Sequence, residues 1–375
     1  MKKKCVCISC FNYYDTRISH VKRYMESQGV DVLYVISDYN HFEKKYYEVD
    51  YPNTIQVHVP KYKKNISLAR IFSQLTFSRK ASEILNKEHP DIVYCMFPPN
   101  SLIGKVIKYK ERSNCKVVFD GYDMWPESMP VSKRLKKILS PIFNRWAGLR
   151  DNYIEGGNLI VVVSQAMLDM VNSKWKDVPI KLLLPSISTS EFPSYTYDVK
   201  SSISFCYLGN INHITDIDLL VEVLGRVAQS KEVKLHIIGE GIKLNELLEK
   251  ASSKGVKCIT HGVIMDAKVK REVYSQCNLA VNLPREEINS TMSLKSVEYL
   301  GVGLPFINSA GGDSWKIVDD FNVGININKD NIDKSVEEIL SLNSDKLSQM
   351  SKNCAKYCEN RFKSQDMGEI FKGIL

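Results

Sequence analysis

Short continuous apolar runs recur along the chain, and between them apolar residues repeat every three or four positions. The short runs are rich in Val, Ile, Leu and Cys, which is typical of parallel strands that are buried on both faces. The longer stretches have the spacing of a helix with one apolar face. In the first half this pattern predicts strands at 4–10, 30–37, 55–59, 91–97, 115–120 and 159–164, and helices at 18–29, 66–88, 101–113 and 166–173.

The second half repeats this alternation after a change in composition. Serine, threonine and proline concentrate between residues 185 and 202, which predicts a linker at 188–202. The pattern then predicts strands at 203–209, 233–239, 256–262, 279–284, 305–308 and 323–328, helices at 215–230, 243–255, 269–276 and 293–301, and a mainly helical tail. The alternation therefore favours an α/β protein with two doubly wound, Rossmann-like domains, at 1–187 and 203–356.

The bulk composition restricts the class of protein. A chain of 375 residues is too long for one ordinary core, which agrees with two domains. Hydrophobic residues make up 44% and charged residues 25%, as in globular proteins, and no apolar run reaches the ~18 residues of a membrane span. The first apolar run is short for a signal peptide, so we expect a buried strand there. The ten cysteines form no CxxC pair, which favours reduced thiols in the cytosol and no metal site.

The net charge of +8 is unevenly distributed. Residues 61–80 and 133–150 each hold six basic residues and no acidic one, and both stretches also contain Ile, Leu, Phe or Trp. This composition suits a surface that binds anionic lipid headgroups, although a merely solvated basic face has the same composition. Nucleic acid is not expected as a partner, because no known binding pattern is present. The predicted membrane patch consists of Lys133, Arg134, Lys136, Lys137, Arg145 and Arg150.

Three predicted strand ends in the second half carry candidate chemistry. Glycines follow two of these strands, and glycine allows a backbone to approach a phosphate closely. The third strand leads to a helix that begins near Ser293, whose first turn offers free N–H groups and the ammonium of Lys295. Glu298 follows three residues later, on the same side of the helix. A diphosphate needs the cation and the N–H groups, and a ribose diol needs a carboxylate, so this order predicts a nucleotide-diphosphate ligand.

Each of these pieces also has a simpler explanation. A GxG sequence is often only a turn, and Lys295 with Glu298 can be a surface ion pair. Their order through one doubly wound domain favours the ligand site. In that order the sequence reads YLGNIN, HIIGEG, VKCITHGVI, CNLAVNLP and SLKSVEYLGVGLPFI, after DTRI, VVFDGYDMWPES and NLIVVVSQAM in the first half.

Over most of its length this series resembles the GT-B glycosyltransferases, in particular glycosyltransferase family 4. The WPES element is most similar to the subgroup that builds bacterial surface polysaccharides. The resemblance implies two Rossmann-like domains that face a central cleft, with the acceptor bound by the first and the nucleotide sugar by the second. It also implies a final helix, at about 357–375, that packs back on the first domain. Transfer proceeds with retention and without a metal or other cofactor in such enzymes.

The resemblance also implies roles for single residues. The catalytic candidates are Asp120, Asp123, Lys295 and Glu298. The other donor-binding candidates are Gly209, Asn210, Gly239, Glu240, Gly241, Gly262, Val263, Arg285, Ser293 and Leu294. The acceptor-side candidates are Asp15, Arg17, Tyr122, Trp125 and Glu127.

The chain departs from the family pattern at four positions. Asn210 and Thr215 stand where many members have an arginine and a lysine that bind the diphosphate. Ser290 replaces an earlier glutamate, and Tyr122 replaces a histidine. Lys295 therefore becomes the main candidate for neutralising the diphosphate, and Arg285 its possible helper.

We expect a retaining glycosyltransferase that moves a sugar from a nucleotide diphosphate to a lipid-linked saccharide. Its products belong to capsule, O-antigen or exopolysaccharide synthesis, and it works in the cytoplasm as a peripheral protein of the inner membrane face. One alternative is a nucleotide-sugar 2-epimerase of the same fold, which needs several acid and base groups around the sugar. Another is a degenerate member that binds ligand without turnover. A dinucleotide oxidoreductase is not favoured, because no strand is followed by GxGxxG.

Overall fold

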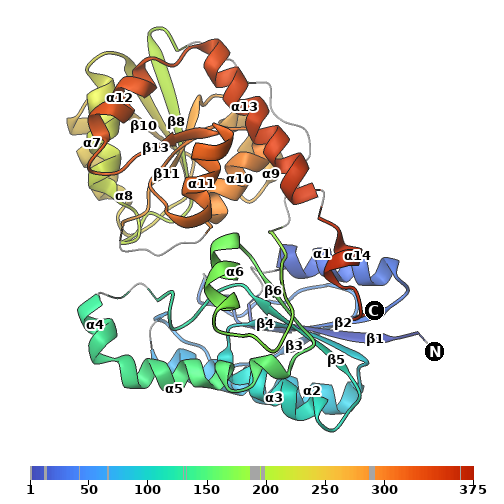
Figure 1. Cartoon of the computed structure of the whole chain (residues 1–375). Coiled ribbons are helices and arrows are strands. Elements are labelled where there is room, and N and C mark those ends of the chain that lie inside the picture. The colour runs from blue at the N-terminus through green and yellow to red at the C-terminus, as the bar shows by residue number, and fades with distance from the viewer. Residues whose placement is uncertain are drawn as a thin grey trace. The chain divides into compact units, whose positions relative to one another are not determined.

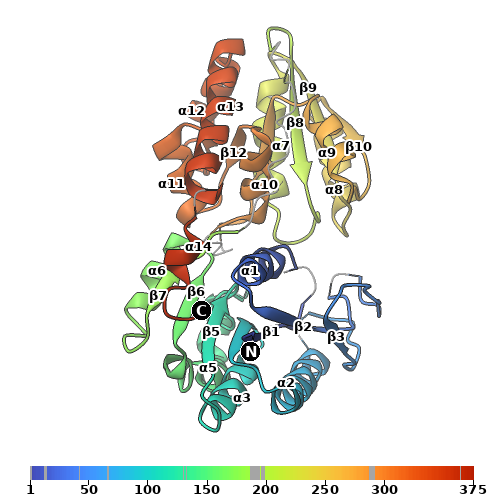
Figure 2. The same ribbon diagram turned by 90° about the vertical axis from the view of Figure 1, so that its right-hand side faces the viewer.

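The computed structural model describes most of the chain. The described residues are 2–11, 15–41, 43–65, 67–129, 131, 133–185, 195, 199–286, 292–363 and 365–375. Ser290 and most of the expected linker lie outside them, as do the side chains of Asp15 and Lys133. The chain divides into two compact units, Met1–Ser186 with Gln365–Leu375, and Ile187–Ser364. Figures 1 and 2 show a twisted sheet with helices on both faces in each unit, so the predicted α/β architecture is confirmed.

The first unit holds a seven-stranded parallel sheet in the order β3-β2-β1-β4-β5-β6-β7. The strands are β1 (Lys4–Ser9), β2 (Asp31–Ser37), β3 (Thr54–Val57), β4 (Ile92–Phe97), β5 (Lys116–Gly121), β6 (Leu159–Val162) and β7 (Ile180–Leu182). The central strands are buried on both faces, which explains their continuous apolar runs. The short edge strand β7 was not predicted, because its three residues alternate polar and apolar.

Helices cover both faces of this sheet. They are α1 (Asp15–Ser27), α2 (Leu68–Glu88), α3 (Asn100–Lys110), α4 (Lys133–Ile138), α5 (Ser140–Asp151), α6 (Gln165–Asn172) and α14 (Met367–Ile370). In both ribbon views α2, α3 and α5 lie along one face, whereas α1, α6 and α14 lie on the opposite face. The helix α2 begins at a Ser67 cap whose hydroxyl accepts from the Arg70 N–H, as expected for a serine N-cap.

The second unit holds a six-stranded parallel sheet in the order β10-β9-β8-β11-β12-β13. Its strands are β8 (Ser202–Leu208), β9 (Glu232–Ile238), β10 (Val256–Thr260), β11 (Leu279–Asn282), β12 (Phe306–Asn308) and β13 (Gly324–Asn326). Its helices are α7 (Ile217–Ala228), α8 (Leu244–Ser253), α9 (Ala267–Tyr274), α10 (Leu294–Val302), α11 (Gly312–Phe321), α12 (Ile332–Leu340) and α13 (Ser344–Cys358). The sequence pattern missed α11, whose N-cap and first residue are the two glycines Gly311 and Gly312.

The end of the chain belongs to the first unit. Met367, Phe371 and Ile374 repeat at helical spacing and are buried in the first core. The Phe371 ring stacks on that of Tyr24, with ring centroids 5.8 Å apart, and the backbone N–H of Leu184 donates to Oε1 of Gln365 at 2.6 Å. The resemblance placed the start of this tail at about 357, whereas residues 357–363 pack with the second unit.

Two further properties follow from the described residues. No helix among them combines the length and the apolar character needed to cross a bilayer. None of the ten cysteines forms a disulfide, and all except Cys258 are buried.

The buried tail supports a prediction about stability. Phe371→Ala removes a ring that is 1% exposed, so we expect it to lower the free energy of unfolding by about 3 kcal/mol. Lys372→Ala is the matched control, because that side chain is exposed, and should change stability by less than about 0.5 kcal/mol. Urea denaturation of both variants measures the difference. Equal stability of the two would show that the tail does not belong to the first core.

Candidate functional site

In open parallel sheets a ligand binds beyond the carboxyl ends of the strands, where the strand order reverses. In the second unit this point lies between β8 and β11. The turn after β8 holds Gly209 and Asn210, and the segment after β11 holds Arg285 and leads to α10. Gly209, Asn210 and Arg285 thus follow the two strands that flank the reversal, whereas the other predicted glycines follow β9 and β10.

The glycines that follow β9 are required because the backbone packs closely there. Gly239 and Gly241 have φ values of 146° and 156°, which only glycine adopts readily. A Cβ atom on Gly239 would lie 2.1 Å from the carbonyl oxygen of Gly209, and one on Gly241 would lie 2.1 Å from that of Ile211. Gly239 also donates its N–H to the Gly262 carbonyl at 2.7 Å. The glycine-bearing loops therefore pack side by side and leave their backbone at the edge of the sheet.

Lys295 lies against this glycine edge. A Cβ atom on Gly209 would lie 3.2 Å from Cε of Lys295, so the absence of a side chain there makes room for the lysine. Its Nζ donates to the Tyr207 hydroxyl at 2.7 Å and lies 3.9 Å from the centre of that ring. In the part of the chain that the structure describes, no carboxylate pairs with Lys295. Burial lowers the pKa of Lys295 to about 7. An anion bound here would restore its positive charge.

Tyr207 holds this lysine in place and was not predicted from the sequence. Its hydroxyl shares a hydrogen bond with Oγ1 of Thr215 at 2.7 Å and donates to the Asn210 carbonyl at 3.1 Å. Burial raises the pKa of Tyr207 to about 12, so it remains a neutral hydroxyl. Thr215 is 3% exposed and acts through Tyr207. Thr215 therefore does not make the diphosphate contact that the lysine at this position makes in many family members.

The helix α10 begins without a side-chain cap. Ser293 occupies the N-cap position, but its hydroxyl donates to Oδ1 of Asn282 at 2.9 Å instead of accepting from the first turn. The first-turn N–H groups of α10 are thus left for another acceptor, and the helix dipole favours an anion there. Leu294 is half exposed beside them.

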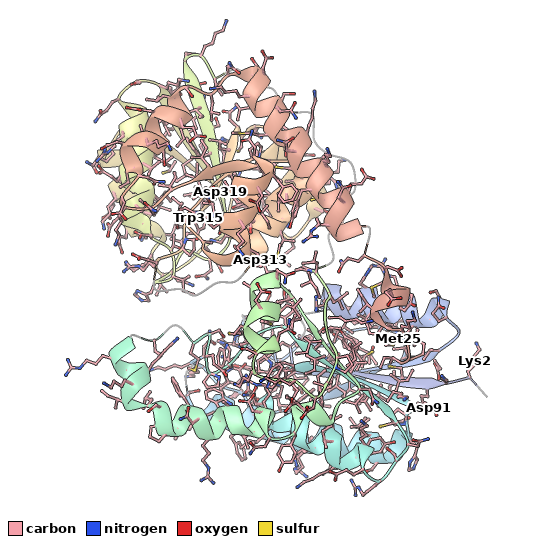
Figure 3. All side chains as sticks on the ribbon, in the orientation of Figure 1. Lys2, Met25, Asp91, Asp313, Trp315 and Asp319 are labelled. Carbon is pink, nitrogen blue, oxygen red and sulfur yellow. The ribbon has the colours of Figure 1, made fainter. Side chains whose placement is uncertain are left out.

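A row of three asparagines holds this helix start. Asn282, Asn308 and Asn326 share one register at the ends of β11, β12 and β13. The amide of Asn282 donates to Asn308 at 2.8 Å, and the amide of Asn308 donates to Asn326 at 2.8 Å. Asn326 in turn donates to the carboxylate of Asp319 at 2.7 Å, on α11 (Figure 3). Ser293 is therefore connected through two buried amides and one half-buried amide to the carboxylate of Asp319.

Glu298 lies on α10 but does not pair with Lys295. Its Oε1 accepts from Lys270 Nζ at 2.6 Å and from the Tyr274 hydroxyl at 2.7 Å. Burial and the nearby carboxylate of Glu298 raise the pKa of Tyr274 well above its usual range. Both partners hold the same oxygen, and Oε2 has no partner among the described residues. Glu298 therefore presents one anchored and one open carboxylate oxygen.

Arg285 is a further half-buried cation of this unit, and no side-chain partner of it is found among the described residues. Its Nε is buried and forms no hydrogen bond, while its backbone N–H donates to the Ile214 carbonyl at 2.8 Å. Glu240 and Val263 are exposed on the glycine loops. Among the described residues, the guanidinium of Arg285 has no carboxylate within ion-pair distance.

In the first unit, the structure assigns Asp120 and Arg17 a role in the core. Asp120 is fully buried and accepts from Nε of Arg17 at 2.8 Å and from Nη2 at 2.8 Å. The Tyr94 hydroxyl also donates to Asp120, and Arg17 Nη1 donates to the Leu183 carbonyl at 2.5 Å. The prediction that Asp120 acts in catalysis is therefore corrected, and so is the prediction that Arg17 lies on the acceptor side. Neither side chain is accessible to a substrate.

Other acceptor-side candidates lie in the segment after β5. Asp123 is half-buried, accepts a hydrogen bond from Ser128, and has a pKa that burial raises. Tyr122 is also half-buried, and burial raises its pKa to about 12. The Trp125 ring lies 4.1 Å from the Arg70 guanidinium and packs edge-on against Trp146. Trp125 thus has packing partners on its ring, and Asp123 is a half-buried carboxylate without an ion-pair partner among the described residues.

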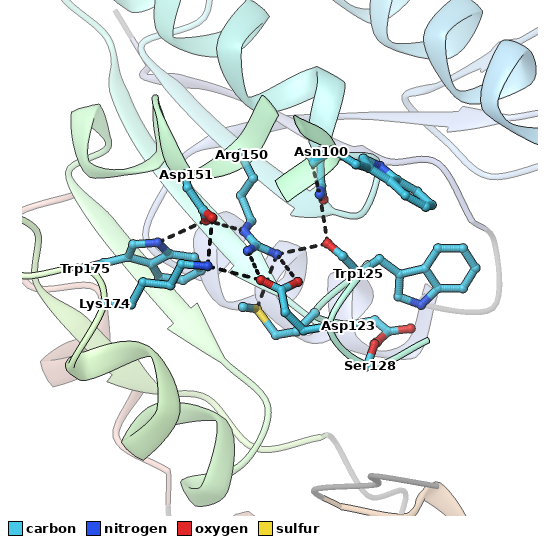
Figure 4. A network of polar contacts seen from close by, with 11 residues as sticks. Asn100, Asp123, Trp125, Ser128, Arg150, Asp151, Lys174 and Trp175 are labelled. Carbon is cyan, nitrogen blue, oxygen red and sulfur yellow. Dashed lines mark hydrogen bonds and ion pairs between the residues drawn. The ribbon is translucent and has the colours of Figure 1, made fainter. Parts of the chain in front are cut away.

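Figure 4 shows Arg150 bonded to Asp151 and to the carbonyl of Trp125. Arg150 is 0% exposed and also donates to Glu127 at 2.6 Å. Its assignment to the membrane patch is therefore wrong, because the carboxylates of Glu127 and Asp151 already neutralise it. Burial raises the pKa of Glu127, but the hydrogen bond and the charge of Arg150, a backbone hydrogen bond and the charge of Lys174 together outweigh that effect and lower it.

The rest of the predicted patch remains at the surface. Arg134, Lys137 and Arg145 are exposed, and no described carboxylate pairs with any of them. Lys136 is half-buried and donates to the Glu127 carbonyl at 2.9 Å.

Comparison with known proteins agrees with this architecture. The family model for "Glycosyltransferase Family 4" matches residues 15–190, and that for "Glycosyl transferases group 1" matches residues 202–345. No curated protein sequence matches the chain.

Several solved structures share the fold at low sequence identity. Sucrose-phosphate synthase from Thermosynechococcus elongatus is 13% identical, with a TM-score of 0.71 over 96% of this chain and 95% of that one. WaaG, a glycosyltransferase involved in lipopolysaccharide biosynthesis, is 12% identical, with a TM-score of 0.67 over 98% and 97%. Anabaena Alr3699/HepE in complex with UDP is 13% identical, with a TM-score of 0.63 over 96% of each chain. These likenesses support the fold.

The buried Arg17–Asp120 pair generates a prediction that separates structure from catalysis. Asp120→Ala leaves a buried guanidinium unpaired, so we expect it to lower the free energy of unfolding by about 3–5 kcal/mol. Asp169→Ala, on the exposed face of α6, is the matched control and should be nearly neutral. Urea denaturation checks both variants. A wild-type stability for Asp120→Ala would contradict the structural role.

Proposed function

Because the chain belongs to the GT-B glycosyltransferases, with a family 4 domain followed by a group 1 domain, we propose that it uses a nucleotide-diphosphate sugar as donor. The observation that carries this proposal is the pair of cations Lys295 and Arg285 at the strand reversal of the second unit, neither of which has a carboxylate partner among the described residues. An uncapped helix start stands at the same edge. Unpaired buried cations are costly to a folded protein, and an anionic ligand offsets that cost.

The parts of the donor correspond to different groups of the site. The diphosphate takes Lys295, Arg285 and the first-turn N–H groups of α10. The open Oε2 of Glu298 accepts from a ribose hydroxyl, while Lys270 and Tyr274 hold the other oxygen. The loop of Gly262 and Val263 lies where the base binds. UDP is the first nucleotide to test, because Alr3699/HepE holds UDP in its solved complex.

In the proposed reaction the bond between the anomeric carbon and the donor oxygen breaks, and the oxygen of the acceptor hydroxyl bonds to that carbon with retention. The proton of this hydroxyl passes to the departing diphosphate. Negative charge then develops on the departing diphosphate. Lys295 and Arg285 are already in place and need no reorganisation, so they stabilise this charge. Removal of one such group typically costs about 10²–10³ in kcat. We propose that these protein cations neutralise the leaving group without a metal ion.

The acceptor side is proposed on other grounds. A lipid-linked saccharide fits a protein that binds the cytoplasmic face of the inner membrane, and the exposed Arg134, Lys137 and Arg145 support such binding. Asp123 is the candidate group for the acceptor hydroxyl, since it is half-buried and Asp120 is fully buried. The proposed product would enter the synthesis of capsule, O-antigen or exopolysaccharide.

One alternative function is also favoured by particular residues. A member that binds nucleotide without turnover fits the replacement of two diphosphate-binding residues by Asn210 and Thr215. Thr215 is buried and bonded to Tyr207, so it cannot replace the lost cation. Sugar transfer to an acceptor separates the two, because only the enzyme forms product. The 2-epimerase alternative is less supported, because both matching family models are glycosyltransferase models.

The open oxygen of Glu298 generates a test of the donor site. Glu298→Gln keeps an oxygen for Lys270 and Tyr274 but removes the charge that the ribose hydroxyls need. We expect UDP to bind about 10- to 100-fold more weakly, since a hydrogen bond to a charged group contributes about 1.5–3 kcal/mol. Glu249→Gln, exposed on α8, is the matched control. Calorimetry and a mass-resolved transfer assay measure both variants, and full activity in Glu298→Gln would contradict the assignment.

The lowered pKa of Lys295 predicts a pH dependence. Above pH 7 the free protein loses the ammonium proton, whereas bound UDP keeps the lysine charged, so binding takes up a proton. UDP itself is fully ionised in that range, because its terminal phosphate group titrates near pH 6. We therefore expect the affinity for UDP to fall between pH 7 and 9, by up to about tenfold per pH unit.

Lys295→Arg is the control for this dependence. Its guanidinium stays charged throughout the range, so its affinity for UDP should change little with pH. Calorimetric titrations at a series of pH values measure both proteins. An equal slope in wild type and Lys295→Arg would show that another group titrates.

A further inference from the structure

Two basic and apolar stretches that are far apart in the sequence meet on one face of the first unit. Helices α2, α3 and α5 lie on the same side of the sheet in both ribbon views (Figures 1 and 2). Between them is an open cavity of about 240 Å³, with Ile71 and Leu75 from α2 on one wall and Ile142 and Trp146 from α5 on the other. We call this cavity the α2–α5 groove. Gln74, Asn100, Ser101 and Arg145 also line it, but most of the lining surface is apolar, which favours an apolar occupant.

Large apolar side chains on α2, α4 and α5 remain exposed. Leu68 and Phe72 on α2 are 83% and 62% exposed, and Ile138 and Ile142 near the start of α5 are 65% and 63% exposed. Single exposed apolar residues are common on proteins, but a group on neighbouring helices marks a binding surface. Each of these side chains gains free energy when it leaves water.

The two stretches that supply most of the lining of the α2–α5 groove are basic. Residues 61–80 and 133–150 contain no acidic residue. Arg145 lines the groove itself, and Arg134 and Lys137 are exposed on α4 and have no carboxylate partner among the described residues. Apolar side chains among cations match a surface that is apolar inside and anionic outside. An anionic phospholipid bilayer has this chemistry, and basic residues near its surface contribute about 1 kcal/mol each.

We propose that the α2–α5 groove receives an acyl chain of an anionic phospholipid and that α2, α4 and α5 together form the membrane-docking face. Arg134, Lys137 and Arg145 bind the headgroup phosphates, while Phe72 and Ile142 enter the acyl region beside the groove. This inference deepens the membrane association proposed above and rests on it. It does not depend on the donor site, which lies in the second unit.

Sedimentation with lipid vesicles tests the docking face. The full chain should sediment with vesicles that contain phosphatidylglycerol, but weakly with phosphatidylcholine alone, and added salt should reduce the binding. Lys137→Glu with Arg145→Glu, and separately Phe72→Ser with Ile142→Ser, should each weaken binding by about tenfold or more. The matched controls lie in the second unit, where Lys257→Glu changes an exposed cation and Ile242→Ser an apolar residue that is 79% exposed. Equal binding by all variants would overturn the docking face.

Fluorescence of Trp146 tests the acyl chain in the groove. Vesicles whose acyl chains carry bromine should quench the tryptophan emission of the wild type, and Trp146→Phe should lose most of this quenching. Binding without quenching would overturn the proposed occupant. Dimer formation in the absence of lipid, abolished by Phe72→Ser with Ile142→Ser, would instead assign the surface to a second copy of the chain.

UDP binding distinguishes a failure of this inference from a failure of the proposed function. The docking variants should bind UDP like the wild type, because their substitutions lie in the first unit. If the wild type binds UDP but no vesicles, the docking proposal fails alone. If it binds vesicles but no nucleotide, the donor proposal fails and the docking face remains.

Discussion

The ammonium of Lys295 stands at the carboxyl edge of the second sheet, where no described carboxylate pairs with it, and the proposed activity depends on it. Tyr207 holds it by a hydrogen bond and by its ring, and Gly209 leaves the space that it occupies. Burial lowers its pKa to about 7, so the folded chain bears a cost for keeping it there. An electrostatic cost of this kind is typical of a binding site, where a bound anion offsets it.

Buried cations elsewhere in the chain show the contrast. Arg17 is neutralised by Asp120, and Arg150 by Glu127 and Asp151. Each of these pairs joins segments of the first unit and leaves little charge for a ligand. Pairing with a carboxylate therefore separates the arginines that stabilise the fold from the cations that remain available for an anion.

The sequence predicted the architecture because alternating apolar runs and helical spacing reflect burial directly. It also placed Gly209, Gly239 and Lys295 after the correct strands. It missed the asparagine row and Tyr207, because a polar residue on a buried strand is assigned a role only when its partners on other strands are known. The same limit explains why the predicted roles of Asp120 and Arg150 needed correction, since residue type does not reveal that a charge is buried beside its partner. The helix α11 was missed because a glycine pair resembles a loop.

A crystal structure of the chain with UDP tests the central claim most directly. The account predicts that the diphosphate lies within hydrogen-bond distance of Lys295 Nζ and of the first-turn N–H groups of α10, with a ribose hydroxyl on Glu298. A diphosphate bound away from α10, with Lys295 still donating only to Tyr207, would contradict it.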